Sequence, residues 1–471
     1  MGLLLASQVE RLGAGEQSRR GRCEAKTLPS VEGMKLITSF TGSRGVRYPA
    51  PDVARGLMLL LIALANVPTW VGLARSSTPP ADTVDTAWLW ARTLLVDHRA
   101  YPLFAMLFGF GLMTMINRRI ASGTRAYLQS LPGVDAGREP TPQEEAWARE
   151  QATVDARRLV RRRGLWMILF GAAHAMLFSG DIIGLYGLIA VVFAGWIARK
   201  HWKRAAILSA VIVVANVVIT FIAGSLMASQ GATPAAEADQ AAGSTVTLLS
   251  YVSDGVTHWA QGMPIGLIIS MVVPAMFLGV RLADTDLIAH PERHRRLLAV
   301  VGVGGLGIGA LGGIGSAVWV TGGPPVIWTV PLHEMAGLVG ACGWLALLAL
   351  YAGGPREGGD LTGLRRLASA VGRRSMTAYL SQSFLFAAVF LALPALTGIR
   401  LHLGEARVAG IAVAVWLVTV LLCTVLERGG HAGPFETLLR TAVARSERKR
   451  RLPAPPVASA VVESDAYGLI R

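Results

Sequence analysis

The sequence has too little charge for a soluble protein of its length. Asp, Glu, Lys and Arg make up 16% of its 471 residues, whereas about 25% is usual in soluble domains. Hydrophobic residues make up 52%, and the mean hydropathy is +0.47. This balance is typical of an integral membrane protein, so we expect a lipid bilayer around most of the chain.

Cysteine is scarce, and the common catalytic motifs are missing. The three cysteines, Cys23, Cys342 and Cys423, match no zinc spacing and no disulfide framework. The sequence contains no H-E-x-x-H, no P-loop and no G-x-S-x-G. We therefore expect no metal cofactor and none of the chemistry that these motifs carry.

Acidic residues are outnumbered by basic ones, 30 against 45, which gives a net charge of +15. The basic residues form clusters between apolar runs, and no basic domain with interleaved aromatics is present. This arrangement argues against nucleic acid as a partner. Basic loops between membrane helices account for the charge, because such loops face anionic headgroups on the cytoplasmic side.

Long apolar runs are abundant. A helix needs about 20 apolar residues to cross a hydrocarbon core of about 30 Å. Ten segments are of about that length: 53–74, 100–117, 164–180, 182–198, 205–228, 262–280, 297–320, 332–352, 375–394 and 407–426. With a cytoplasmic N-terminus, only five of the 45 basic residues lie on the outer side, as the positive-inside rule requires. We predict an all-α polytopic membrane protein with about ten transmembrane helices and both termini cytoplasmic.

The same pattern divides the chain into three regions. Residues 1–47 are predicted to be a disordered cytoplasmic segment, residues 48–440 the transmembrane domain, and residues 441–471 a basic, then Pro/Ala-rich cytoplasmic tail. Within the domain, a cytoplasmic loop covers 118–163. It contains a capping-box signature at Thr141 and Glu144, which predicts a helix that lies along the membrane surface.

Glycines at regular spacing mark one expected helix contact. Gly305, Gly309 and Gly313 recur every four residues inside an apolar segment, which favours close packing against another membrane helix. The letters of a dinucleotide fingerprint in the same run carry no weight, because that motif needs a preceding strand and an aqueous helix N-terminus.

Strongly polar residues inside apolar segments are costly, so each needs a partner or a cavity. They are Asn66, His174, Asp181, His333, Glu334, Tyr379 and Gln382. At 1.5 Å per residue, Asn66 lies about 16 Å from Arg55 and His174 about 15 Å from the start of its segment, so the two are expected at similar depth. They can converge on one polar cavity, with a histidine as general base and Asn66 holding a carbonyl. Alternatively, each forms a hydrogen bond with a neighbouring helix.

Five sequence blocks resemble a known family. They are "RGLMLLLIALANVP" (55–68), "YPLFAMLFGFG" (101–111), "GAAHAMLFSGDIIGLYGLIA" (171–190), "VGRRSMTAYLSQS" (371–383) and "GPFETLLR" (433–440). In this order they are similar to the blocks of the YeiB-like bacterial membrane proteins, a family with a domain of unknown function. The fourth block departs from the family pattern at Arg374 and Ala378, where Met and Asn are usual.

That family is similar to transmembrane acyltransferases, including heparan-alpha-glucosaminide N-acetyltransferase. The resemblance implies a catalytic role for Asn66, eleven residues after Arg55. The histidine expected just after this helix is replaced by Ser77, which leaves His98 and His174, with Asp181 two turns after His174, as candidates.

The resemblance further implies acyl-CoA as the co-substrate and an envelope lipid or glycan as the acceptor, in the bacterial inner membrane. Arg55, Arg163, Arg373, Tyr379 and Gln382 are the expected CoA-binding residues, and a homo-oligomer is compatible with the sequence. Two other functions stay open. Prolines in the first and sixth segments favour a transporter or flippase. A non-catalytic envelope scaffold is the other alternative.

Overall fold

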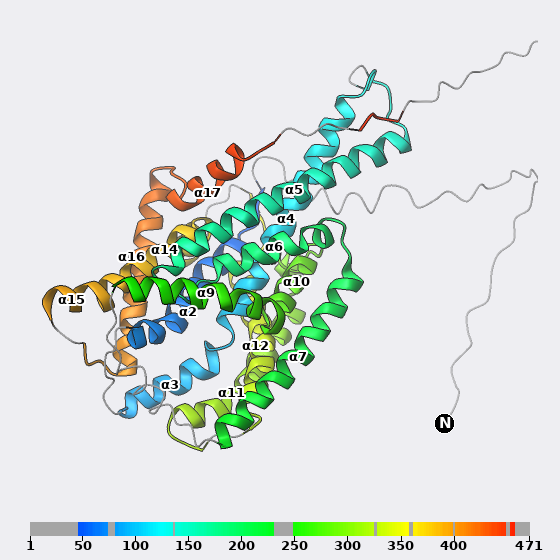
Figure 1. Ribbon diagram of the computed structural model, residues 1–471. Coiled ribbons are helices and arrows are strands. Elements are labelled where there is room, and N and C mark those ends of the chain that lie inside the picture. Colours follow the sequence, from blue (N-terminus) through cyan, green and yellow to red (C-terminus); the bar gives the residue numbers. More distant parts are fainter. Residues whose placement is uncertain are drawn as a thin grey trace, which may run out of the picture. The chain divides into compact units, whose positions relative to one another are not determined.

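The computed structural model describes residues 46–73, 81–134, 137–229, 248–324, 327–357, 361–398, 401–448 and 453–456. The predicted disordered segment therefore lies outside the described residues except at its end, as does most of the tail after residue 448. Helices account for nearly all the regular structure described (Figure 1). This confirms the all-α prediction.

The helices follow the chain in the order of Figure 1. Their bounds are α2 (Ala50–Leu73), α3 (Thr83–Leu95), α4 (Ala100–Gln129), α5 (Pro142–Ala175), α6 (Ile183–Ala198), α7 (Trp202–Ser229), α9 (Leu248–Ile269), α10 (Val272–Leu282), α11 (Arg295–Val320), α12 (Thr329–Ala352), α13 (Gly363–Arg373), α14 (Ser375–Ala387), α15 (Leu393–Thr397), α16 (Glu405–Arg428) and α17 (Pro434–Arg445). A 3₁₀ turn (Pro291–Arg293) precedes α11, and a π-helical segment (Ala388–Ala392) joins α14 to α15. Two-residue strands, β1 (Val46–Arg47) and β2 (Arg356–Glu357), pair antiparallel.

Seven helical stretches of the described chain are long and apolar enough to cross a membrane. An eighth would be α9 and α10 together, a pair bent by 61°. The protein is thus a multi-pass membrane protein by the length and composition of its helices. Each of the ten expected segments is largely helical, but 262–280 is divided between α9 and α10, and 164–180 extends past the end of α5 at Ala175. In addition, α6 is short, and the apolar half of α5 follows a highly charged half. Ten crossings and the placement of the termini stay predictions.

The loop predicted at 118–163 is a pair of long antiparallel helices, because α4 and α5 extend through it side by side (Figure 1). The capping box at the start of α5 is confirmed. Thr141 Oγ1 accepts from Glu144 N at 3.3 Å, and Glu144 Oε2 accepts from Thr141 N at 2.8 Å. The helix predicted after Thr141 is continuous with the third apolar segment, because α5 continues without a break to Ala175. No proline interrupts it after its first turn. Its position along the membrane surface stays a prediction.

Helices α11 and α12 pack along the predicted glycine stripe. A Cβ added at Gly305 would lie 2.9 Å from the carbonyl oxygen of Val339, and one at Gly309 would lie 2.9 Å from the Cα of Gly340. Gly307, on the other side of α11, has nothing within 4 Å. The stripe therefore allows close backbone approach, as its spacing predicted.

Candidate functional site

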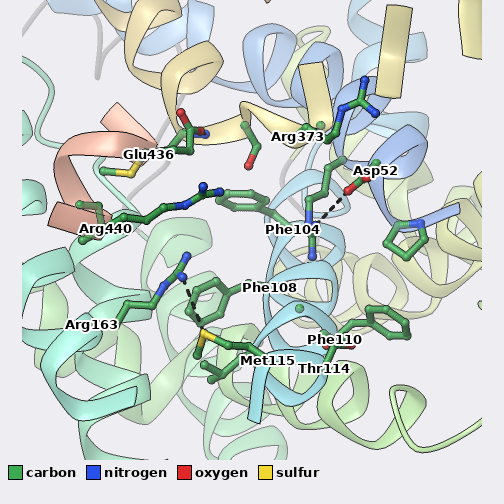
Figure 2. Close-up of a pocket in the computed structure, with 18 of the residues that line it drawn as sticks. Asp52, Phe104, Phe108, Phe110, Thr114, Met115, Arg163, Arg373, Glu436 and Arg440 are labelled. Atoms are coloured by element: carbon green, nitrogen blue, oxygen red, sulfur yellow. Dashed lines mark hydrogen bonds and ion pairs between the residues drawn. The ribbon is translucent and has the colours of Figure 1, made fainter. Parts of the chain in front are cut away.

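One cavity of the described chain has a volume of about 1260 Å³. It is lined by arginines and is called the arginine cavity below. Figure 2 shows Arg163 from α5 and Arg440 from α17 extending into it beside the rings of Phe104 and Phe108. Four of the nine residues predicted for the site line it, namely Arg55, Arg163, Arg373 and Tyr379. Its seven arginines are Arg55, Arg118, Arg119, Arg163, Arg366, Arg373 and Arg440.

Three carboxylates line the same cavity, and two of them are engaged in contacts at its rim. Glu427 pairs with Arg373 and, at 2.6 Å, with Arg374. Glu436 caps the N-terminus of α14 and accepts from Met376 N at 2.7 Å. These contacts hold α14, α16 and α17 together at the rim, so little acidic charge remains to balance the arginines inside.

The third carboxylate, Asp52, lies 3.5 Å from Arg55. Arg163 and Arg440 form no ion pair with any described residue, and the hydrogen bond of Arg163 is a weak one to Met115 Sδ at 3.8 Å. Guanidinium groups that face a cavity without a carboxylate partner are suited to bind phosphates or other anions.

Two glycines bring the arginine-bearing helices α2 and α13 into contact beside this cavity. A Cβ at Gly56 would strike the carbonyl of Ala368, and one at Gly372 would strike the carbonyl of Asp52. Only glycine permits such a close approach of two backbones. Gly56, the second residue of the first sequence block, is therefore required for the close contact between α2 and α13.

A second cavity of about 440 Å³ contains Asn66 on α2 and is called the Asn66 cavity. Ser316 and Trp319 on α11 and Thr329 on α12 also line it. The side chain of Asn66 is half-buried and forms no hydrogen bond with a described residue. The structure therefore places this amide at a cavity and does not show the alternative, a hydrogen bond to a neighbouring helix.

His98 lines the Asn66 cavity from the turn between α3 and α4. Its Nδ1 lies 2.9 Å from Glu334 Oε1, and Tyr101 donates to Glu334 Oε2 at 2.5 Å. The backbone of His98 has φ 58°, a left-handed conformation that non-glycine residues adopt at a cost and that is frequent at functional sites. With Nδ1 held by a carboxylate, Nε2 is the nitrogen left for chemistry in the cavity.

Arg99 lies behind this histidine and is completely buried. It donates to the carbonyls of Thr93 at 2.8 Å and Asp97 at 2.5 Å, and its Nη1 lies 2.8 Å from His333 Nε2. Sequence reasoning missed both Arg99 and the pairing of Glu334 with His98. Neither has a local signature, because the partners are more than 230 residues apart.

His174 and Asp181 are brought together, but they line neither cavity. His174 Nδ1 lies 2.8 Å from Asp181 Oδ1, and His174 Nε2 lies 2.9 Å from Ser383 Oγ on α14. The prediction that His174 and Asn66 share one cavity is therefore wrong. The two were placed by depth alone, and the imidazole faces α14. Gln382 also lines neither cavity and donates to Leu59 O at 3.3 Å.

The two cavities meet at a pair of aromatic side chains. Phe104 on α4 and Tyr379 on α14 line both, with ring centroids 6.5 Å apart. Tyr379 was predicted to bind the co-substrate, and the structure places it at the boundary between the cavities. No group of three or more His, Cys, Asp or Glu residues in the described part of the chain is arranged to hold a metal ion.

A known family model matches the part of the chain that contributes the C-terminal residues of this site. Residues 282–446 match a family model described as "Protein of unknown function (DUF418)". This region is DUF418-like. The match is consistent with the YeiB-like resemblance, and it covers Tyr379, Ser383 and the rim residues Arg373, Glu436 and Arg440. Asn66, His98 and His174 precede the DUF418 match. No curated protein and no solved structure matches the chain.

Proposed function

We propose that this protein is a membrane acyltransferase that moves an acyl group from acyl-CoA in the arginine cavity to an acceptor in the Asn66 cavity. The observation that carries the proposal is the wall that the two cavities share at Phe104 and Tyr379. A donor and an acceptor that enter separate cavities would place their reacting groups at this wall. Proximity of that kind supplies a large part of many catalysed rates.

The arginine cavity suits the donor. CoA carries several phosphate charges on one end and a long, thin thioester arm on the other. The arginines would bind the phosphates, and the arm would lie along Phe108, Met167 and Tyr186 toward Tyr379. The positive-inside pattern supports a cytoplasmic position for this cavity, on the side where acyl-CoA is made.

The Asn66 cavity suits the acceptor. With its Nδ1 held by Glu334, His98 would take the proton of an acceptor hydroxyl on Nε2. The amide of Asn66, which has no hydrogen bond to a described residue, would donate to the carbonyl oxygen as negative charge develops there. The acceptor would be a lipid or glycan of the bacterial envelope that enters from the other side of the inner membrane.

A transporter is the second candidate, favoured by the 61° bend between α9 and α10. Broken helices are common in transporters, where they line the substrate site. Neither α9 nor α10 contributes a residue to the two cavities described here. Acyl transfer accounts for the arginines of one cavity and for Asn66 and His98 in the other, so it is preferred.

The test uses purified protein in nanodiscs with bacterial lipids, incubated with acyl-CoA while steady-state thiol release is followed. We expect turnover to fall about 100-fold or more in Asn66→Ala and His98→Gln, the size of a general-base or oxyanion effect. His201→Gln is the control, because His201 lines neither cavity. Absence of CoA binding would refute the proposal. Uptake of CoA or its acyl group into vesicles without thiol release would support the transporter instead.

A further inference from the structure

Three buried side chains outside both cavities form a continuous hydrogen-bonded relay. Asp181, His174 and Ser383 are each less than 10% exposed, and the relay links the start of α6 through α5 to α14. The carboxylate also accepts from Gly184 N at 2.8 Å and Trp259 Nε1 at 3.2 Å. The imidazole is therefore oriented by a carboxylate that is itself fixed by two further donors.

The direction of the hydrogen bonds follows from the chemistry of the groups. An ionised carboxylate can only accept, so His174 Nδ1 carries the hydrogen that Asp181 receives. In the neutral imidazole Nε2 is then an acceptor, and the hydroxyl of Ser383 donates to it. A hydroxyl that donates to a histidine whose other nitrogen is held by a carboxylate is the arrangement that activates a serine nucleophile.

Two serines of another helix, α7, behave differently. Ser209 donates to Ala205 O and Ser225 donates to Phe221 O, both at 2.8 Å and one turn back in their own helices. Such bonds satisfy a hydroxyl inside a membrane helix at little cost. Ser383 instead bonds a histidine 209 residues away in sequence.

Tyr379 connects the relay to both cavities. It lies one turn before Ser383 on α14, and its ring packs edge-on against His174 with centroids 5.4 Å apart. Because Tyr379 also forms part of the wall between the cavities, a shift of its side chain would expose Ser383 at that wall.

From this geometry we infer that Ser383 is a nucleophile that carries the acyl group as an ester between donor and acceptor. The inference rests on the proposed acyl transfer and adds a covalent step to it. His174 would act as the base and Asp181 as the residue that positions it. Tyr379 would control access to Ser383.

The steps balance as follows. Ser383 Oγ attacks the thioester carbonyl, its proton moves to His174 Nε2, and the carbon–sulfur bond breaks so that CoA thiolate leaves into the arginine cavity. The acceptor hydroxyl then attacks the serine ester and loses its proton to His98. The bond from the acyl carbon to Ser383 Oγ breaks, and His174 returns the proton to that oxygen. Water takes the proton from His98 and supplies one to the thiolate.

The first test needs no acyl-CoA. Purified protein in nanodiscs is treated with a small fluorophosphonate, which forms a covalent adduct with activated serines, and the modified peptide is found by mass spectrometry. We expect labelling at Ser383, a loss of at least tenfold in His174→Asn and Asp181→Asn, and faster labelling in Tyr379→Ala. Ser383→Ala should remove the adduct, and Ser225→Ala should not.

The second test uses acyl-CoA under single-turnover conditions with His98→Gln protein. We expect a burst of about one equivalent of thiol and an acyl group on the Ser383 peptide, because only the second step is blocked. A protein that binds CoA but shows neither burst nor label at Ser383, even with Tyr379→Ala, would overturn the covalent step and leave direct transfer standing. Labelling at Ser383 without CoA binding would retain the nucleophile and refute the proposed donor.

Discussion

Removal of one guanidinium from the arginine cavity should weaken donor binding while it leaves the free protein as stable as before, or more so. Arg163 is the residue for this change. It forms no ion pair with a described residue, and burial, together with the nearby guanidinium groups of Arg440 and Arg55, lowers the pKa of Arg163. In the free protein the neighbouring guanidinium groups repel this charge, and the carboxylate of Glu436 offsets only part of that repulsion and of the cost of burial.

A hydrogen bond between charged groups contributes about 1.5 to 3 kcal/mol, so loss of an Arg163–phosphate contact should raise the Kd for CoA about 10- to 150-fold. A ligand at 100 times its Kd stabilises a protein by about 2.7 kcal/mol. With a Kd ten times higher, the same concentration stabilises by only about 1.4 kcal/mol. The Arg163→Met variant should therefore lose about half or more of the stabilisation by CoA.

Calorimetric titration of CoA and thermal unfolding with and without CoA measure the two quantities separately. Arg445→Met is the matched control, because Arg445 lies on α17 like Arg440 but does not line the cavity. The reasoning would be refuted by Arg163→Met protein that binds CoA normally. A large loss of stability in the ligand-free variant would also contradict it, since it would show that the guanidinium is a structural group.

Three further predictions address other parts of the chain. The ion pair with Arg138 and the capping bonds lower the pKa of Glu144 to about 2. Its stabilisation of the α4–α5 pair is therefore complete above about pH 4.5 and is lost as the pH falls toward 2. Hydrogen exchange should show this loss of protection, and the Glu144→Gln variant should show a weaker pH dependence. Gly309→Leu should destabilise the protein by about 1 to 3 kcal/mol through overpacking, whereas Gly307→Leu, facing open space, should leave the unfolding temperature unchanged. Glu334→Gln should slow turnover about 100-fold by releasing His98 without changing the Kd for CoA, and an equal loss of CoA binding would contradict that role.

The sequence was sufficient to locate the long apolar helices and part of the arginine cavity. Apolar length places those helices, because a membrane helix must present about 20 apolar residues. The shorter helices α3, α13 and α17 lie outside the ten predicted segments. Basic clusters flank those segments, so Arg55, Arg163 and Arg373 were expected near one another. The glycine stripe of α11 was also predictable, since close backbone packing leaves a regular spacing in sequence.

The rest of the site depends on how each helix is rotated about its own axis. Counting residues gives the depth of a side chain in the membrane, but depth does not say which neighbour the side chain faces. Asn66 and His174 were placed together for this reason, although His174 faces Ser383. The pairing of His98 with Glu334 brings together residues from different helices, and no local pattern records such a contact.

Two side chains, Phe104 and Tyr379, line both cavities. Tyr379 is only 2% exposed, so its ring can turn only when the side chains packed around it move as well. A connection between the cavities would therefore open more slowly than exposed side chains change rotamer. The frequency of exchange between the donor and acceptor sides should thus depend on how tightly the helices pack around Tyr379.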